Sequence, residues 1–187
     1  MSDPILRLKG VKTDIAQYHI LHGVDLDVPR GAVTMLLGRN GAGKTTTLRT
    51  IMGLWKPHQG EILLDGAHIN GLNPAQIARR GIGFVPEDMG IFSDLSVEEN
   101  IRLAALSGQP SPERMEWIFA AFPALKTFWK SAAGTLSGGQ KQMLSVARAM
   151  VEDRALYLID EPSKGLAPAI VATLARALKD LKARGAT

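Results

Sequence analysis

The first third of the chain consists of short apolar runs separated by turns that contain glycine and proline. Four segments in which apolar residues alternate with polar ones, or follow one another directly, are predicted to be strands: 5–11, 20–28, 33–37 and 61–64. The turn sequences 29–31 and 57–60 separate these strands. This pattern predicts a sheet at the N-terminal side, which we expect to be mixed.

A different periodicity begins at residue 96, where Val97, Ile101 and Ala104 recur at helical spacing. After a break at 108–112 the helical pattern resumes, so we predict that 96–135 is a helical subdomain inserted into the domain. Three further elements are predicted: strands at 81–86 and 155–159 and a helix at 169–184. Together these elements predict an α/β fold.

Composition and charge narrow the class of protein. The 187 residues, of which 45% are hydrophobic, suffice for one domain, 1–187, with a substantial core. The lysines and arginines behind the net charge of +4 are dispersed, which argues against a nucleic-acid partner. Because the chain has no cysteine, disulfides and thiolate metal sites are excluded.

Nothing in the hydropathy pattern predicts a membrane segment or a signal peptide. No apolar run reaches the ~18–20 residues that a membrane-spanning helix needs. Charged residues near the N-terminus, among them Asp3, Arg7 and Lys9, interrupt any apolar stretch there. By elimination we expect a cytoplasmic location.

A glycine-rich motif, Gly-Arg-Asn-Gly-Ala-Gly-Lys-Thr at 38–45, lies between a predicted strand at 33–37 and a predicted helix from Thr45 to Met52. This is the context that a phosphate-binding loop requires, and it indicates a P-loop NTPase core. The glycines allow a tight bend that turns successive N–H groups toward an anion. The residues expected to line the nucleotide phosphates are Gly38, Asn40, Gly41 and Gly43. A plain glycine-rich turn is disfavoured because strand, motif and helix agree.

The last residues of the motif carry the more specific chemistry. Lys44 is expected to contact the β- and γ-phosphates of ATP, and the start of the following helix adds a positive dipole end. Thr45 is the expected hydroxyl ligand of Mg²⁺, and Thr46 is placed for further phosphate hydrogen bonds.

Two consecutive carboxylates, Asp160 and Glu161, end the apolar run 155–159. Adjacent side chains leave an extended chain in different directions, so the two acids can take different roles. Asp160 is expected to bind Mg²⁺, directly or through a water, and Glu161 to polarise the water that attacks the γ-phosphate. An acidic turn after a core strand is the alternative.

Between these motifs lies Leu136-Ser137-Gly138-Gly139-Gln140, followed by a predicted helix. In this order the three motifs resemble those of the ATP-binding-cassette (ABC) ATPases, whose signature pentapeptide this segment matches. The resemblance implies that 1–187 is a single nucleotide-binding domain whose helical subdomain carries the signature. It also implies that Ser137–Gln140 contact the γ-phosphate held by a second, opposed subunit. An ordinary helix cap and turn is the alternative.

A finer resemblance is to the ATPase subunits of importers for branched-chain amino acids, or for urea and short-chain amides. The segments 85–92, 95–100 and 161–168 carry it. It implies a partner ATPase that is the same or a sister chain, transmembrane permease subunits and, indirectly, a periplasmic or extracellular binding protein. It also implies a peripheral position on the inner face of the membrane.

Glu87 departs from the broad superfamily, which mostly has a glutamine that touches Mg²⁺ and the attacking water, and resembles the importer branch instead. A carboxylate can also bind the metal, so Glu87 is a candidate Mg²⁺ ligand. The alternative is an exposed loop acid.

Two residues, Ile15 and Tyr18, are candidates for the contact with the adenine base. Family members usually stack the base on an aromatic residue at the position that matches Ile15, which offers only an apolar contact. The nearby Tyr18 could supply an aromatic face.

Family members continue beyond the position of Thr187 into another strand and a polar switch residue. We therefore expect that the chain is C-terminally truncated, and that it binds ATP but hydrolyses it poorly. Two rival functions stay open: a soluble ABC ATPase that is not linked to transport, and a non-hydrolysing regulatory cassette. A small-molecule kinase is least favoured because it has no use for 136–140.

Overall fold

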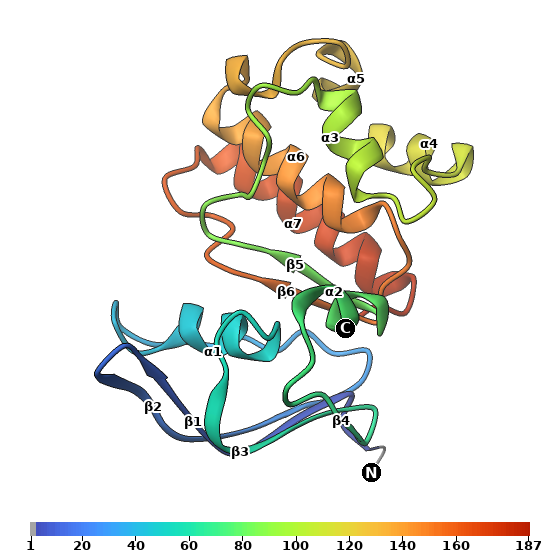
Figure 1. Ribbon diagram of the computed structural model, residues 1–187. Coiled ribbons are helices and arrows are strands. Elements are labelled where there is room, and N and C mark those ends of the chain that lie inside the picture. The colour runs from blue at the N-terminus through green and yellow to red at the C-terminus, as the bar shows by residue number, and fades with distance from the viewer. Residues whose placement is uncertain (1–2) are drawn as a thin grey trace. The chain divides into compact units, whose positions relative to one another are not determined.

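The computed structural model describes residues 3–187, which form two compact units (Figure 1). The first contains the chain up to Phe84, together with Ala155–Asp160 and Lys182–Thr187. The second contains Val85–Arg154 and Glu161–Leu181. Each unit is described by itself below.

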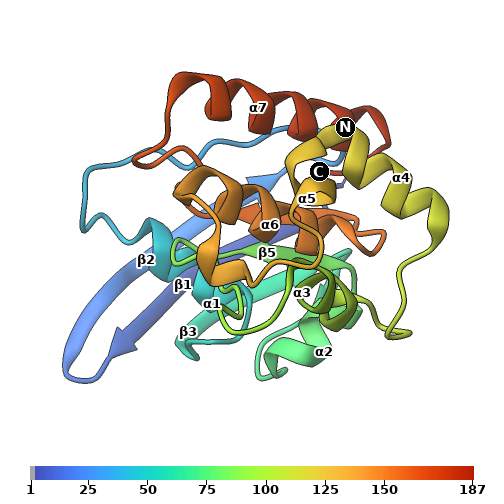
Figure 2. The ribbon, with the colours of Figure 1, turned by 90° about the horizontal axis from the view of Figure 1, so that it is seen from above.

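The main sheet of the first unit has four strands in the order β2-β1-β3-β4. They are β1 (Leu6–Ile15), β2 (Tyr18–Val28), β3 (Pro57–Leu64) and β4 (Ala67–His68). Figure 2 shows the long hairpin that β1 and β2 form. All three strand pairs are antiparallel, and Leu6 faces Val28 on one side and Leu64 on the other. Three of the predicted strands are thus present, and β3 begins inside the predicted turn 57–60.

The predicted strand 33–37 does not form. Its side chains are exposed, with values of 68% for Val33, 74% for Met35 and 80% for Leu37. Among residues 3–187, no backbone hydrogen bond joins this segment to a neighbouring strand. An apolar run shows that a segment can be buried, but a strand also needs a neighbouring strand to pair with. The four-stranded sheet consists of β1 to β4 and does not include the segment 33–37. The four-stranded sheet, which we expected to be mixed, is antiparallel in all three of its strand pairs.

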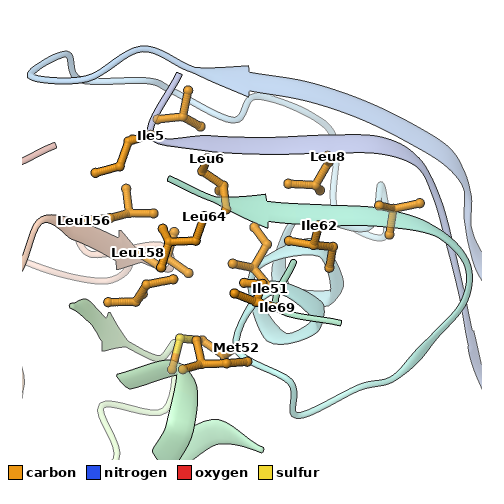
Figure 3. Close-up of a cluster of buried hydrophobic side chains, with 14 of the residues drawn as sticks. Ile5, Leu6, Leu8, Ile51, Met52, Ile62, Leu64, Ile69, Leu156 and Leu158 are labelled. Atoms are coloured by element: carbon orange, nitrogen blue, oxygen red, sulfur yellow. The ribbon is translucent and has the colours of Figure 1, made fainter. Parts of the chain in front are cut away.

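A cluster of buried apolar side chains forms the core of the first unit (Figure 3). Leu6 and Leu8 project from one face of β1, because residues two apart on a strand point the same way. They meet Ile51 from α1 (Lys44–Ile51) and Ile62 from β3. Leu158 and Leu156 belong to the same cluster and come from β6 (Leu156–Ile159), which pairs with β5 (Ile82–Val85). The short helix α2 (Pro74–Arg79) also contributes Ile77 to this core. The phosphate loop and Asp160 are therefore attached to elements of one core.

The second unit is helical. Its helices are α3 (Val97–Ala104), α4 (Pro112–Ala121), α5 (Pro123–Thr127), α6 (Gly138–Met150) and α7 (Pro168–Ala183), with a short 3₁₀ turn at Ala133–Thr135. Ser96 and Ser111 cap α3 and α4 by accepting backbone N–H bonds, as serine does at helix starts. The helices predicted within 96–135 and near 169–184 are present. Among residues 3–187, no helix is long and apolar enough to cross a bilayer.

Candidate active site

The phosphate loop has a backbone that only glycine tolerates at two positions. Gly41 and Gly43 have φ angles of 82° and 88°. A side chain at Gly43 is disfavoured for a second reason, because an added Cβ would lie 2.9 Å from Cδ2 of Leu21 and would force that side chain to shift. Residues 38–42 are exposed, so the backbone of the bend is open to a ligand.

Gly43→Ala is expected to destabilise the protein by about 1–3 kcal/mol, because it combines a left-handed backbone with a clash. Gly66→Ala is the matched control, since Gly66 has a φ of 74° but open space around the added Cβ. Chemical denaturation should give the larger loss for Gly43→Ala. Equal losses would contradict a role for the contact with Leu21.

Helix α1 starts directly after the loop, and Gly43 at its N-cap provides no side-chain cap. The first-turn N–H groups and the helix dipole therefore favour an anion at this end. The Nζ atom of Lys44 donates to the carbonyl oxygens of Gly38, at 3.0 Å, and Arg39, at 3.3 Å, so its ammonium lies against the loop. Thr45 and Thr46 are half-buried in the same turn.

Asp160 follows β6 and is 3% exposed. It lies in the same unit as the phosphate loop. Glu161 comes next in the chain, belongs to the second unit and is less buried, with a side-chain exposure of 28%. Its φ of 43° is unusual for a residue other than glycine and is characteristic of strained functional positions. The two carboxylates thus differ in burial.

Glu161 and Glu87 share one cation in the second unit. The Nζ atom of Lys164 lies 2.5 Å from Oε1 of Glu87 and 3.7 Å from Oε2 of Glu161. The hydrogen bond to Glu87, and secondarily the charge of Glu161, raise the pKa of Lys164 above its ordinary value. Sequence reasoning missed Lys164, although its position three residues after Glu161 was a signal that could have identified it.

Glu87 lies on a segment that is fastened to α6. Ser145 Oγ donates to the carbonyl oxygen of Met89 at 2.6 Å. Arg148 donates to Gly90 O, and its guanidinium lies 5.0 Å from the ring centroid of Phe92. Burial lowers the pKa of Arg148. These contacts join the Glu87 segment to the helix that begins at the signature, and no local sequence pattern indicates them.

The signature residues form the start of α6. Ser137 is its N-cap, with Oγ accepting from Gln140 N–H at 3.3 Å while Gln140 Oε1 accepts from Ser137 N–H at 2.8 Å. This arrangement leaves the hydroxyl hydrogen of the exposed Ser137 available as a donor. Gly138 has open space around it, whereas Gly139 packs against Ile170 of α7. The cap that we considered as an alternative is present, and it is compatible with anion binding.

The two candidate adenine contacts face each other across the β1–β2 hairpin, where Ile15 pairs with Tyr18. Tyr18 is 63% exposed and so presents its ring to solvent, while Ile15 is half-buried. Next to them, Asp14 bonds His19 at 2.6 Å and lies 3.2 Å from His58. These two contacts hold the strands together next to the turn of the β1–β2 hairpin.

A magnesium site made by protein side chains alone is not found, since no group of three or more His, Cys, Asp or Glu residues within 3–187 is arranged to hold an ion. Mg²⁺ usually takes one or two protein oxygens and completes its shell with phosphates and water. The hydroxyl of Thr45 and the buried carboxylate of Asp160 are donors of that kind within one unit. The donor set therefore fits Mg²⁺ delivered together with a nucleotide.

Comparison with known proteins adds independent findings. The model of the family described as ABC transporter matches residues 21–164. The chain is 37% identical over 166 residues to a probable branched-chain amino acid transport ATP-binding protein, LivF, of Archaeoglobus fulgidus, covering 88% of this chain and 70% of the relative. It is 36% identical over 185 residues to the high-affinity branched-chain amino acid transport ATP-binding protein BraG of Pseudomonas aeruginosa, covering 98% and 79%.

Among solved structures, the chain is similar to a dimeric bacterial ABC transporter cassette. The TM-score is 0.83 at 27% sequence identity, and the match covers 97% of this chain and 85% of the cassette. The family match includes the phosphate loop, the signature and the acid pair, and so spans both units.

Proposed function

Since the chain belongs to the ABC transporter family, and is thus an ATP-binding subunit with ATPase activity, we propose that it powers an importer of branched-chain or other amino acids. The observation that carries this proposal is the likeness to two branched-chain amino acid transport ATP-binding proteins across 88% and 98% of the chain. The cargo itself would be selected by other subunits.

In the proposed mechanism, the loop backbone from Gly38 to Gly43 binds the phosphates of ATP, and Lys44 places its ammonium at the β- and γ-phosphates. Tyr18 or Ile15 contacts the adenine. Thr45 and Asp160 would hold Mg²⁺, with Glu87 as a further candidate ligand, and the ion would supply positive charge that offsets the charge of the phosphates.

Glu161 is the proposed base. Its carboxylate accepts a proton from a water molecule whose oxygen bonds to the γ-phosphorus, while the bond from that phosphorus to the bridging oxygen breaks. The products are ADP and inorganic phosphate. The greater exposure of Glu161, compared with Asp160, supports its assignment to the residue that meets water.

ABC cassettes of this kind dimerise and work with transmembrane permease subunits. We propose that Ser137, Gly138, Gly139 and Gln140 of one copy donate to the γ-phosphate on the opposed copy, which is the same or a sister chain. ATP then closes a head-to-tail dimer and hydrolysis reopens it, which moves the permease subunits. A periplasmic or extracellular binding protein would deliver the cargo, and the cassette would lie on the inner face of the membrane.

Ser137→Arg tests the opposed signature. The bulky cation should weaken ATP-dependent dimerisation by about thirtyfold or more, because it fills the position of a central contact. ATP affinity of the monomer should stay the same. Analytical ultracentrifugation with and without ATP, alongside a nucleotide titration, measures both quantities. Ala120→Arg, at an exposed position of α4, is the control that should dimerise normally. Dimerisation of Ser137→Arg at wild-type strength would contradict the model.

Co-purification tests the transport function. An affinity-tagged protein, extracted from the native membrane with detergent, should carry polytopic membrane subunits and a cassette partner that mass spectrometry identifies. Recovery with ribosomal or DNA-bound partners instead would leave the ATPase chemistry intact and exclude import.

A further inference from the structure

We propose that a pocket in the second unit binds a free α-amino acid with an apolar side chain, such as leucine. Glu98 binds the ammonium group of the ligand, Arg102 binds its carboxylate, and the apolar lining of the pocket covers its side chain. The inference goes beyond the proposed function, in which other subunits select the cargo. It concerns residues outside the phosphate loop, the signature and the acid pair.

The pocket has the size that an amino acid needs. Its volume is about 250 Å³, slightly below the ~300–1,000 Å³ of pockets that hold drug-sized ligands. Its lining comes from α3, from α4, from the connection between these two helices and from the segment before the signature. All lining residues belong to the second unit, so the whole pocket lies within one compact unit.

Four apolar side chains form part of the lining. Ile101 is fully buried, whereas Pro110, Met115 and Trp129 are half-buried and present part of their surface to a ligand. The ring of Trp129 is held by edge-to-face packing on Phe119, with 5.1 Å between the ring centroids. A leucine-sized side chain that is covered by this surface loses apolar contact with water, which favours binding.

Two opposite charges, one helical turn apart on α3, also line the pocket. Nη1 of Arg102 lies 3.8 Å from Oε1 of Glu98, which is an ion-pair distance but too long for a hydrogen bond. Lys130 donates to the other oxygen of Glu98, Oε2. Within residues 3–187, neither Oε1 of Glu98 nor the guanidinium of Arg102 makes a hydrogen bond. Both groups therefore keep hydrogen-bonding capacity for a ligand.

A zwitterion satisfies both charges at once. A free amino acid carries its ammonium and its carboxylate on the same carbon atom, close enough together to meet Glu98 and Arg102 simultaneously. A guanidinium can donate two parallel bonds to a carboxylate, and an ammonium donates to a carboxylate oxygen. The existing pair is partly exposed, 22% for Glu98 and 48% for Arg102, so separating its members costs little. A ligand with a single charged group would meet only one of the two residues.

Backbone hydrogen bonds hold the charged and the aromatic sides of the pocket together. Glu98 N–H donates to the carbonyl oxygen of Trp129 at 3.0 Å, and Val97 N–H donates to the carbonyl oxygen of Ser131 at 3.0 Å. The start of α3 and the Trp129 segment are thus fixed relative to one another before a ligand arrives. Such preorganisation reduces the conformational entropy that is lost on binding.

An NMR titration with L-leucine, without nucleotide, tests the site through the indole N–H signals of the protein. The signal of Trp129 should shift and saturate, with a dissociation constant of about 1 mM or tighter. The signals of Trp55 and Trp117, which do not line the pocket, should stay in place. The absence of a saturable shift of Trp129 up to about 10 mM leucine would overturn the inference.

Two leucine analogues test whether both charges are recognised. Isocaproate lacks the ammonium group of leucine and isoamylamine lacks its carboxylate, while both keep the apolar part. Each should bind at least about tenfold more weakly than leucine. If either analogue binds as tightly as leucine, the pocket does not recognise a zwitterion and the inference is wrong.

Variants that remove one charge locate the binding site. Glu98→Gln and Arg102→Gln should each weaken leucine binding about fivefold or more. Unchanged Trp55 and Trp117 signals show that a variant is folded in both units. The matched controls Glu116→Gln and Arg176→Gln, at exposed positions outside the pocket lining, should bind leucine like the wild type. Wild-type affinity in either Glu98→Gln or Arg102→Gln would contradict the assignment.

These titrations contain no ATP and no membrane subunit, so their outcome is independent of the proposed function. A chain that does not bind leucine but carries membrane subunits on purification would overturn only the pocket. A chain that binds leucine but purifies without them would overturn only the transport function.

Discussion

Lys44→Ala should weaken ATP binding by about a hundredfold, the largest effect expected on affinity in this chain. Its ammonium already lies against the loop, 3.0 Å from the carbonyl oxygen of Gly38, and is the charge that the sequence places at the β- and γ-phosphates. A hydrogen bond between charged groups contributes ~1.5–3 kcal/mol, and an unpaired phosphate charge adds to the loss. A fluorescent-nucleotide titration measures the change.

The control for this substitution is Lys56→Ala, an exposed lysine of the same unit outside the loop. It should bind ATP like the wild type. If Lys44→Ala keeps the wild-type dissociation constant, the loop is not the phosphate site.

Glu161→Gln should slow hydrolysis by about 10²–10⁴-fold and leave ATP binding intact. The amide keeps the size of the side chain but cannot accept the proton of the attacking water. Because the γ-phosphate then persists, the ATP-bound dimer should accumulate. A phosphate-release assay and size-exclusion chromatography with ATP report the two effects.

Glu116→Gln, on the exposed side of α4, is the matched control and should hydrolyse ATP at the wild-type rate. Rapid turnover by Glu161→Gln would assign the base to another residue.

The elements that the sequence predicted well are those whose signals are local. Alternating burial in β1 and the serine cap of α6 follow from residues within a few positions of one another. The segment 33–37 shows the limit of such signals. Its apolar run specifies a preference for burial, but strand formation also depends on a partner edge that no local pattern describes.

The candidate site likewise has one part that local sequence motifs indicate and another part that depends on tertiary structure. The phosphate loop, the acid pair and the signature are short motifs, so the sequence alone suffices to propose a role for each of their residues. The contacts from Lys164 to Glu87 and from Ser145 to Met89 depend on tertiary structure, because the partners are far apart in the chain. Such contacts carry no periodicity and no motif, and only the fold brings the partners together.

The capping box at the start of α6 has a kinetic consequence. The hydrogen bonds between Ser137 and Gln140 restrict the serine to one rotamer before any partner arrives. The conformational entropy of ordering this side chain is therefore lost when the protein folds and is not lost again on association. In the proposed dimer, a second subunit that brings a γ-phosphate would meet a hydroxyl whose oxygen is already in place, so association would not have to order this side chain.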